Sequence, residues 1–325
     1  MRSVTGIPRI FLLPLFCIIT AISSSAASNP AADLLASGRV DESIAILQKA
    51  VSDSPTDAAS FNLLCRAYYS YGDWDKGISA CEKAVALEPT NSLYHLWLGR
   101  IYGEKADNSN VFTAGSLAKK VHTEFETAVR LNPENVEARS DLSEFYVEAP
   151  GMMGGGTDKA EAQAQALEKL FPAKAHWIRA RIAEKKKDFA TAEKEYRQEI
   201  QSRDASDTWL DLANYYRHRN QMPEMEDAIN HAVAGKIDPP EAATEAAESL
   251  IRTGRNPTKA IELLRHYLDS GHTTEEAPAF KAHYLLGSVL EKQGDTKGAA
   301  QEYSAALAMA KGFSRAKDAL DRVNH

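Results

Sequence analysis

Apolar and small residues recur along most of the chain at the spacing of one face of an α-helix. In the stretch 58–91 they follow the i, i+3, i+4, i+7 pattern twice, at Phe61, Leu64, Cys65 and Tyr68 and then at Cys81, Ala84 and Val85. Tyr71-Gly72-Asp73 separates the two faces, and Pro89 follows the second. Helices of about a dozen residues are marginal alone in water, so each apolar stripe needs a neighbour. The stretch therefore predicts a hairpin of two packed helices.

The same pattern returns further along the chain with a period of about 34 residues. Matching positions of the first helix are Leu98, Gly99 and Tyr102, then Leu142, Ser143 and Tyr146, then Leu212, Ala213 and Tyr216, and finally Leu286, Gly287 and Leu290. A small residue in the first helix, an aromatic residue three positions later, an Ala in the second helix and a final Pro resemble the tetratricopeptide repeat. This resemblance covers nearly all of the chain beyond residue 30. It implies an all-α fold, a right-handed superhelical solenoid of about eight helical hairpins.

The pattern divides the chain into four parts. Residues 1–27 carry two arginines, an apolar run at 10–22 and small residues at 23–27, which is typical of a secretory signal peptide. The run is shorter than the roughly 20 residues of a membrane-spanning helix. We therefore expect a chain that is exported, to the periplasm or outside the cell, with a retained N-terminal anchor as the alternative. Residues 28–57 predict a degenerate first repeat, 58–279 the main array, and 280–325 the last repeat with a capping helix.

Two units are longer than the template. The extra residues lie near 104–116, with a loop expected at 108–110, and near 150–156. Both fall between the two helices of a hairpin, so they are expected at the same edge of the stack in neighbouring units. The glycine-rich stretch 151–156 has the glycine spacing of a phosphate-binding loop, but Thr157-Asp158 stands where Lys and a hydroxyl residue should follow. We interpret it as a lengthened turn. The polar connection 269–279 is a candidate hinge.

Charge narrows the classes of partner. The chain carries a formal charge of −7 from 38 basic and 45 acidic residues. Removal of Arg2 and Arg9 with the signal leaves 36 basic residues and a charge of −9. Such an acidic array has no general reason to bind nucleic acid or an anionic membrane surface.

Motifs for catalysis or cofactor binding are not found in the sequence. The nine histidines show no ligand spacing, so we expect no metal site, and His95, His176 and His283 occupy a repeated position in the hairpin core. Neither Gly-x-Ser-x-Gly nor His-Glu-x-x-His occurs. We expect no enzyme activity and no cofactor.

Cys65 and Cys81 are the two cysteines that follow the signal segment. They lie on the facing sides of one predicted hairpin, and an exported protein meets conditions in which disulfides persist. A bridge needs Cα atoms about 4.4 to 6.8 Å apart, which an antiparallel helix pair can provide. The alternative is that both are small core residues without a bridge.

The resemblance also implies which residues line the concave face of the solenoid. They are Asn62, Arg66, Tyr69, Leu96, Arg100, Trp177, Arg181, Leu210, Asn214, Arg217, Arg252 and Tyr284. Five arginines on one face suit a partner segment that carries carboxylates, and the interleaved aromatic and aliphatic residues suit apolar anchors. The alternative is that the arginines pair with acids of the same face, such as Glu144, Glu148 and Glu245. The Lys and Asn residues of the family's carboxylate clamp are missing.

The function that this resemblance implies is an exported scaffold for protein–protein interaction, with the partner bound in the concave groove. The alternative is a small-ligand or carbohydrate-binding component of an envelope transport or assembly system, with the two insertions folded over the groove.

Overall fold

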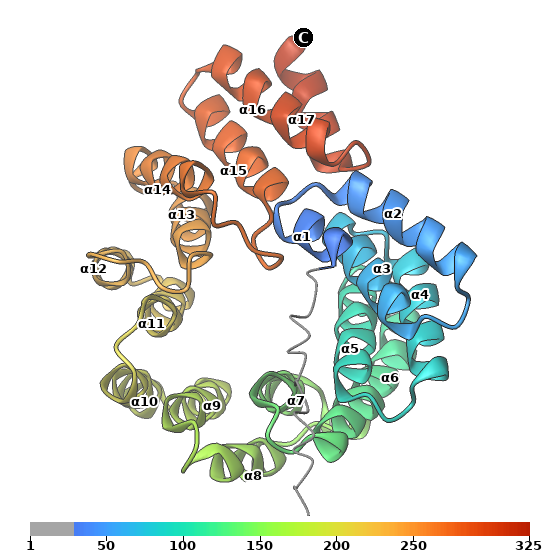
Figure 1. Cartoon of the computed structure of the whole chain (residues 1–325). Coiled ribbons are helices and arrows are strands. Elements are labelled where there is room, and N and C mark those ends of the chain that lie inside the picture. The colour runs from blue at the N-terminus through green and yellow to red at the C-terminus, as the bar shows by residue number, and fades with distance from the viewer. Residues whose placement is uncertain (1–28) are drawn as a thin grey trace, which may run out of the picture.

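The computed structural model describes residues 29–325. These residues form seventeen α-helices and one short 3₁₀ helix, and this part of the chain contains no β-strand. Figure 1 shows the helices stacked in chain order along a curved superhelix. The expected all-α solenoid is confirmed, whereas the expected signal peptide lies outside the described residues.

Sixteen of the helices form eight antiparallel hairpins, and the seventeenth covers the end of the stack. The hairpins are α1 (Pro30–Ala36) with α2 (Val40–Asp53), α3 (Ala58–Tyr71) with α4 (Trp74–Leu87), α5 (Ser92–Asp107) with α6 (Val111–Leu131), α7 (Val136–Glu148) with α8 (Thr157–Leu167), α9 (Pro172–Lys185) with α10 (Phe189–Ser202), α11 (Ser206–His218) with α12 (Met222–Ala232), α13 (Ala242–Thr253) with α14 (Pro257–Ser270), and α15 (Ala279–Lys292) with α16 (Thr296–Met309), followed by α17 (Ser314–Asn324).

Polar residues at the turns decide where many helices begin. The side chains of Asp57, Asp73 and Asn91 accept hydrogen bonds from backbone N–H groups in the first turns of α3, α4 and α5. Such caps satisfy donors that have no partner within the helix. Because the second hairpin has a cap before each helix and Gly72 in a left-handed conformation between them, its boundaries follow from its sequence.

The apolar positions of the repeat form the core. Leu64, Cys65 and Tyr68 of α3 are buried, as are Cys81 and Ala84 of α4. Side chains at these spacings share one helix face, so each hairpin buries a stripe against its own partner helix and against the next hairpin. The result is two large apolar clusters, each of which spans several hairpins, rather than a set of separate hairpin cores.

The first insertion has its turn at 108–110, where a loop was expected, and its other residues are helical. Helix α5 continues to Asp107 and α6 begins at Val111, so the extra residues lengthen both helices and only 108–110 form the turn. Asn110 caps α6 by accepting hydrogen bonds from the backbone N–H groups of Phe112 and Thr113. Leu117 and Val121 are buried on the same face of the longer helix. The inserted residues thus extend the hairpin instead of leaving it.

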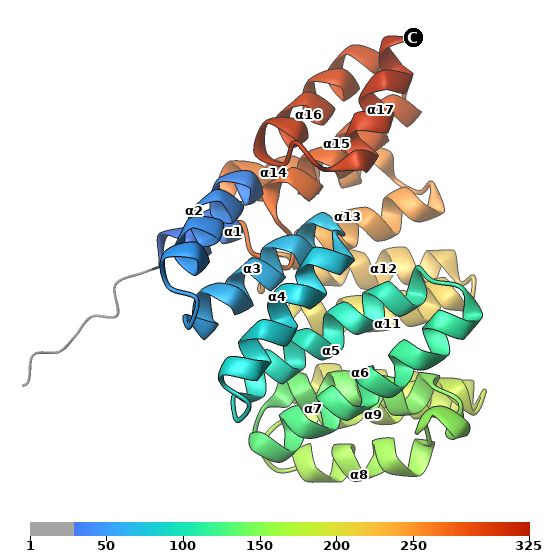
Figure 2. The same ribbon diagram turned by 90° about the vertical axis from the view of Figure 1, so that its right-hand side faces the viewer.

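Both views show the first repeat beside the last one. In Figure 1 the first helix of most hairpins lies on the inner side of the curve, and α1 and α2 lie next to α15 and α17; Figure 2 shows the same neighbours from the side. The Thr273 hydroxyl donates to the Ala36 carbonyl at 3.1 Å. Gly38 has φ +78°, and a Cβ at this position would lie 2.7 Å from the backbone nitrogen of Ala279. The superhelix therefore closes on itself.

Apolar and polar contacts both hold this closure. Phe280 of α15 lies 6.4 Å from Tyr71 and 5.1 Å from Phe313, measured between ring centroids. The backbone N–H of Lys311 donates to Asp41 at 2.9 Å. The C-terminal repeat thus shares a hydrophobic cluster with the N-terminal repeats, including Leu35. We call this set of contacts the seam.

Candidate functional site

The position within the inner helix decides which predicted concave residues reach the surface. Asn62, Leu96 and Leu210 are buried against neighbouring helices. Arg66, Arg100 and Asn214, one helical turn further along, are half-exposed. The second group is thus accessible to a partner in this structure and the first group is not. The others are half-exposed or, for Arg252, exposed: Tyr69, Trp177, Arg181, Arg217 and Tyr284.

An aromatic residue that we did not predict joins two of the arginines. The guanidinium carbons of Arg66 and Arg100 lie 5.1 and 5.0 Å from the ring centroid of Trp97. Tyr69 meets the same ring edge-on at 5.4 Å. Cation–π and edge-to-face contacts of this kind hold the side chains in place. Trp97 is one position past Leu96 in α5, and the repeat template gave no reason to assign it to the concave face.

These residues line a cavity of about 440 Å³. Its wall also includes Lys281 of α15, Glu241, and Glu275 of the segment 271–278 that joins α14 to α15. Burial lowers the pKa of Lys281 and raises that of Glu275. The cavity is therefore bounded by helices far apart in the chain, which the closure of the superhelix brings together. No residue of either insertion lines it.

Each of the arginines around this cavity already has a carboxylate. Arg66 makes a two-pronged contact with Glu275, with Nε to Oε1 at 2.7 Å. Arg100 donates to Asp141 at 2.6 Å and to Glu137 at 3.0 Å. Planar guanidinium groups favour this geometry with carboxylates. The pairing shows that the site can hold carboxyl groups, which here come from the chain itself.

The next arginine along the concave side is paired in the same way. Arg181 of α9 donates to Glu144 at 2.6 Å, and it also contacts Glu148 and Glu184. Arg252 is paired with Glu248 on its own helix at 2.7 Å. Arg217 contacts the side-chain oxygen of Asn214 at 3.3 Å. Four of the five arginines thus have carboxylate partners within the fold.

An acidic cluster on α10, α11 and α13 was not predicted. Its five carboxyl groups are Glu199, Asp207, Asp211, Glu241 and Glu245. Trp177, which we had assigned to the concave face, donates from Nε1 to Asp211 at 3.1 Å. Burial and neighbouring carboxylates raise the pKa of Glu245 to about 7. The spacing of Asp207 and Asp211 on one helix face was visible in the sequence, but Glu199 and Glu241 come from other helices.

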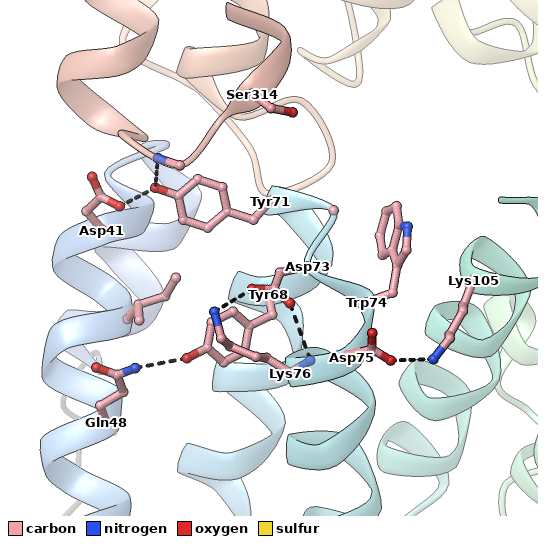
Figure 3. A pocket seen from close by; sticks show the side chains of 13 residues that line it. Asp41, Gln48, Tyr68, Tyr71, Asp73, Trp74, Asp75, Lys76, Lys105 and Ser314 are labelled. Carbon is pink, nitrogen blue, oxygen red and sulfur yellow. Dashed lines mark hydrogen bonds and ion pairs between the residues drawn. The ribbon is translucent and has the colours of Figure 1, made fainter. Parts of the chain in front are cut away.

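A second cavity, of about 570 Å³, lies beside the seam (Figure 3). The Tyr71 hydroxyl contacts Asp41 and accepts a hydrogen bond from the Gly312 N–H at 3.0 Å. Across the cavity Gln48 donates to the Tyr68 hydroxyl at 2.9 Å. The Tyr71 contacts link the first and last repeats, and none of the unpartnered buried polar atoms found in residues 29–325 lines this cavity.

The two insertions lie side by side, as expected for the same edge of the stack. A Cβ added at Gly115 of α6 would lie 3.2 Å from the Met153 side chain. Phe112 is 93% exposed and Met152 is 83% exposed. These apolar side chains face solvent at the tips of α6 and of the 3₁₀ helix η1 (Gly151–Met153).

The two cysteines of the second hairpin form a disulfide. Their Cα atoms are 5.2 Å apart, and both residues are fully buried. The bond joins α3 to α4 next to the concave cavity, since Arg66 follows Cys65 directly.

The three histidines at the repeated position each contact a glutamate of the same hairpin. His95, His176 and His283 pair through Nδ1 with Glu124, Glu195 and Glu302 at 2.5, 2.7 and 2.6 Å. Within residues 29–325 no group of His, Cys, Asp or Glu side chains has an arrangement that could hold a metal ion. The same part of the chain contains no helix with the length and apolar character of a membrane span.

Comparison with known families gives matches over more than half of the chain. Sequence models of the tetratricopeptide repeat match residues 34–101 and, for a second model, residues 154–207 and 244–312. Proteins with these repeats bind proteins or peptides and are generally non-catalytic scaffolds. No curated protein matches the sequence.

Solved structures give the same fold at low sequence identity. The crystal structure of yeast Tom70 matches with a TM-score of 0.52 and 13% identity, over 94% of this chain and 65% of that one. A thermophilic tetratricopeptide repeat protein from Thermus thermophilus matches at 0.45 and 16%, over 68% and 95%. A repeat protein from Parabacteroides merdae matches at 0.43 and 14%, over 91% and 96%. The Tom70 match supports the fold alone.

Proposed function

Because this chain belongs to the tetratricopeptide repeat family, we propose that it is an exported scaffold that binds a segment of a partner protein on its concave face. The observation that carries the proposal is the cavity in which Arg66 and Arg100 contact Trp97. Trp97 is buried and holds the half-exposed Arg66, Arg100 and Tyr69 in place, and these three side chains form the surface offered to a partner.

The partner segment that we propose is acidic and carries aromatic or aliphatic anchors. Its carboxylates would take the places of Glu275 at Arg66 and of Glu137 at Arg100, and an anchor would pack on Tyr69 beside the buried Trp97. Glu137 is largely exposed, so its ion pair with Arg100 contributes little free energy. A carboxylate of the partner can therefore replace Glu137 at small cost. The whole chain has an acidic net charge, which would repel an acidic segment. The preference for such a segment therefore comes only from the arginines at the cavity.

Capture from an envelope extract with the mature protein as bait tests the function. A reproducible partner protein is expected. Arg100→Ala combined with Arg181→Ala should weaken its binding and flatten the salt dependence, because two positive charges are lost. Tyr69→Ala, at the proposed anchor position, and Trp177→Ala, further along the concave face, should each weaken binding with little change in salt dependence. Arg265→Ala, at an exposed position on α14, is the matched control and should bind like wild type. If all variants bind the partner like wild type, the binding site is not on the concave face.

Export is tested separately. We propose that the mature chain begins near Ala27 or Ser28, because small residues precede this point after an apolar run. Intact-mass analysis of protein from the envelope fraction measures this directly. A chain that still carries residues 1–26 would contradict cleavage.

A further inference from the structure

Three buried carboxyl oxygens of the acidic cluster lack hydrogen-bond donors. They are Glu199 Oε2, Asp207 Oδ1 and Glu241 Oε2, and only two other buried side-chain N or O atoms in residues 29–325 are in this state. Glu199 is only 1% exposed. Buried polar groups without partners are rare because each loses its hydration without compensation. Their concentration in one cluster indicates that a donor from outside the chain belongs there.

Positive charge near the cluster is scarce. Lys174 of α9 is near Asp211 and Glu199, but its Nζ lies over the Trp177 ring, 4.6 Å from the centroid. Arg203 donates to the other oxygen of Asp207 at 2.8 Å. From the same helix as Asp211, Asn214 donates to Glu245 at 2.8 Å. Two cations thus lie among five carboxyl groups, and Lys281 shares the cavity wall with Glu241. Asp238, Glu248 and Glu276 add further negative charge around the cluster.

Protonated carboxyl groups reduce the electrostatic repulsion within the acidic cluster. The Glu199 and Asp211 carboxyl groups are neighbours, and burial together with their like charge favours a proton on one of the two. Burial, followed by the charge of Asp211, raises the pKa of Glu199 well above its ordinary value. A bound cation would replace these protons as the counter-charge.

The arrangement of the oxygens favours one kind of cation. They come from three helices and form no group that could hold a metal ion. Ammonium and guanidinium groups carry three and five N–H donors that can reach several carboxylates at once. The half-buried Trp177 beside Asp211 has an aromatic ring that can contact such a group. Lys174 makes this kind of cation–π contact with the same ring.

We propose that this acidic cluster binds the ammonium or guanidinium groups of a Lys- or Arg-containing segment of a partner protein. The site lies on the same concave side as the cavity at Trp97, since Glu241 belongs both to the cluster and to the wall of that cavity. One segment can therefore present acidic residues to Arg66 and Arg100 and basic residues to the accessible Glu241 and Glu245, behind which Glu199 is buried. This assignment rests on the proposed function only in one respect, namely that the cationic group belongs to a partner protein.

Isothermal titration of the full mature chain with a tetra-arginine peptide, at low salt and pH 7.5, tests the site without the partner. Saturable binding to one site is expected. Glu199→Gln combined with Glu241→Gln should weaken it by about tenfold or more, because an amide cannot ionise to become the counter-charge of a bound cation. The matched control is Glu224→Gln with Glu262→Gln, two exposed glutamates on α12 and α14, which removes at least as much negative charge from the chain. It should change the affinity less than about twofold.

Proton release gives a second measurement that general charge attraction would not produce. Near pH 6.5, titrations in buffers of different ionisation enthalpy should show protons released on binding to wild type and fewer released by the Glu199→Gln, Glu241→Gln variant. Equal weakening in both double variants, or no saturable binding to wild type, would overturn the proposal. Spermidine that binds with the same variant dependence, while the peptide does not bind, would replace the protein segment with a small polyamine. Failure of partner capture with intact peptide binding would count against the proposed function alone.

Discussion

Glu199 places a carboxyl group where neither water nor a basic side chain fully compensates it. The side chain is buried, and Oε2 receives no hydrogen bond from residues 29–325. Because its pKa is raised in the folded chain, folding takes up a proton between the ordinary carboxyl pKa and the raised value. The contribution of Glu199 to stability is therefore greatest at low pH, below the ordinary carboxyl value, and is lost as the pH rises through the raised value.

Glu199→Gln should remove this pH dependence. We expect the variant to be more stable than wild type at pH 8 by on the order of 1 kcal/mol, since the neutral amide needs no proton to stay uncharged beside Asp211. At pH 4 the two proteins should melt at nearly the same temperature. Thermal unfolding followed by circular dichroism measures both, with Glu262→Gln as the control. A shift of equal size at the two pH values would show that packing, not ionisation, causes it.

The bridge between Cys65 and Cys81 makes a second prediction at this scale. The closed loop holds about 15 residues, so on the chain-entropy model reduction should lower the free energy of unfolding by about 3 kcal/mol. Dithiothreitol should lower the melting temperature of wild type but not of Cys65→Ser with Cys81→Ser. Thiol counting on the denatured, non-reduced mature chain should find no free thiol. Two free thiols would contradict the bridge.

The arginines show what could be learned about the site from sequence. The repeat position alone indicated that Arg66, Arg100 and Arg181 face the inner side, because the helical period fixes directions within a repeat. Their partners could not be predicted in the same way. Glu275 is more than 200 residues from Arg66, and the contact depends on how far the whole stack curves. The place of Trp97 in the cavity wall was not predicted, because consecutive residues of a helix point in different directions and the template assigned only its neighbour Leu96 to the concave face.

For the first insertion, the sequence predicted the number of extra residues better than their secondary structure. The sequence indicated extra residues between 104 and 116, and the structure places most of them in α5 and α6. An insertion can lengthen a loop or two helices, and only its apolar spacing decides between them. Leu117 and Val121 carry that spacing into the extension, so the sequence contains the information that these residues are helical.

The second insertion depends on one close backbone approach. A Cβ at Gly155 would lie 1.8 Å from the Ala149 carbonyl oxygen, whereas one at Gly151 would meet no atom within 4 Å. Gly155→Ala should therefore destabilise the protein by about 1 to 3 kcal/mol, because the turn must shift to accept the methyl group. Gly151→Ala is the matched control and should stay close to wild type. Chemical denaturation at equilibrium compares them, and equal stability of the two variants would contradict the packing of this turn.

Closure of the superhelix belongs to the whole molecule. Each repeat contacts its sequence neighbours, and small rotations between repeats add up along the stack. The polar connection 269–279 was expected as a hinge, and in the structure it reaches the first repeats through Thr273 and Glu275. No repeat pattern contains the sum of those rotations, so the seam could not be predicted from sequence, although the eight hairpins and the cap could.

The pair between Arg66 and Glu275 connects the seam to the concave cavity. Glu275 and Arg66 have side chains that are 12% and 24% exposed, so the pair is shielded from solvent and is screened little by salt. Removal of one member leaves the other as an uncompensated charge. Glu275→Gln should therefore loosen the segment 271–278 and favour a more open superhelix, while Glu276→Gln, the exposed neighbour, should not.

Small-angle X-ray scattering of the full mature chain measures this difference. Wild type and Glu276→Gln should give the same radius of gyration, and Glu275→Gln and Arg66→Ala should each give a larger one. The double variant should open no further than either single variant, because both act through the same pair. A wild-type profile for Glu275→Gln would mean that the apolar contacts around Phe280 and Phe313 hold the seam without the ion pair. In that case a partner could exchange with Glu275 at the cavity while the superhelix stays closed.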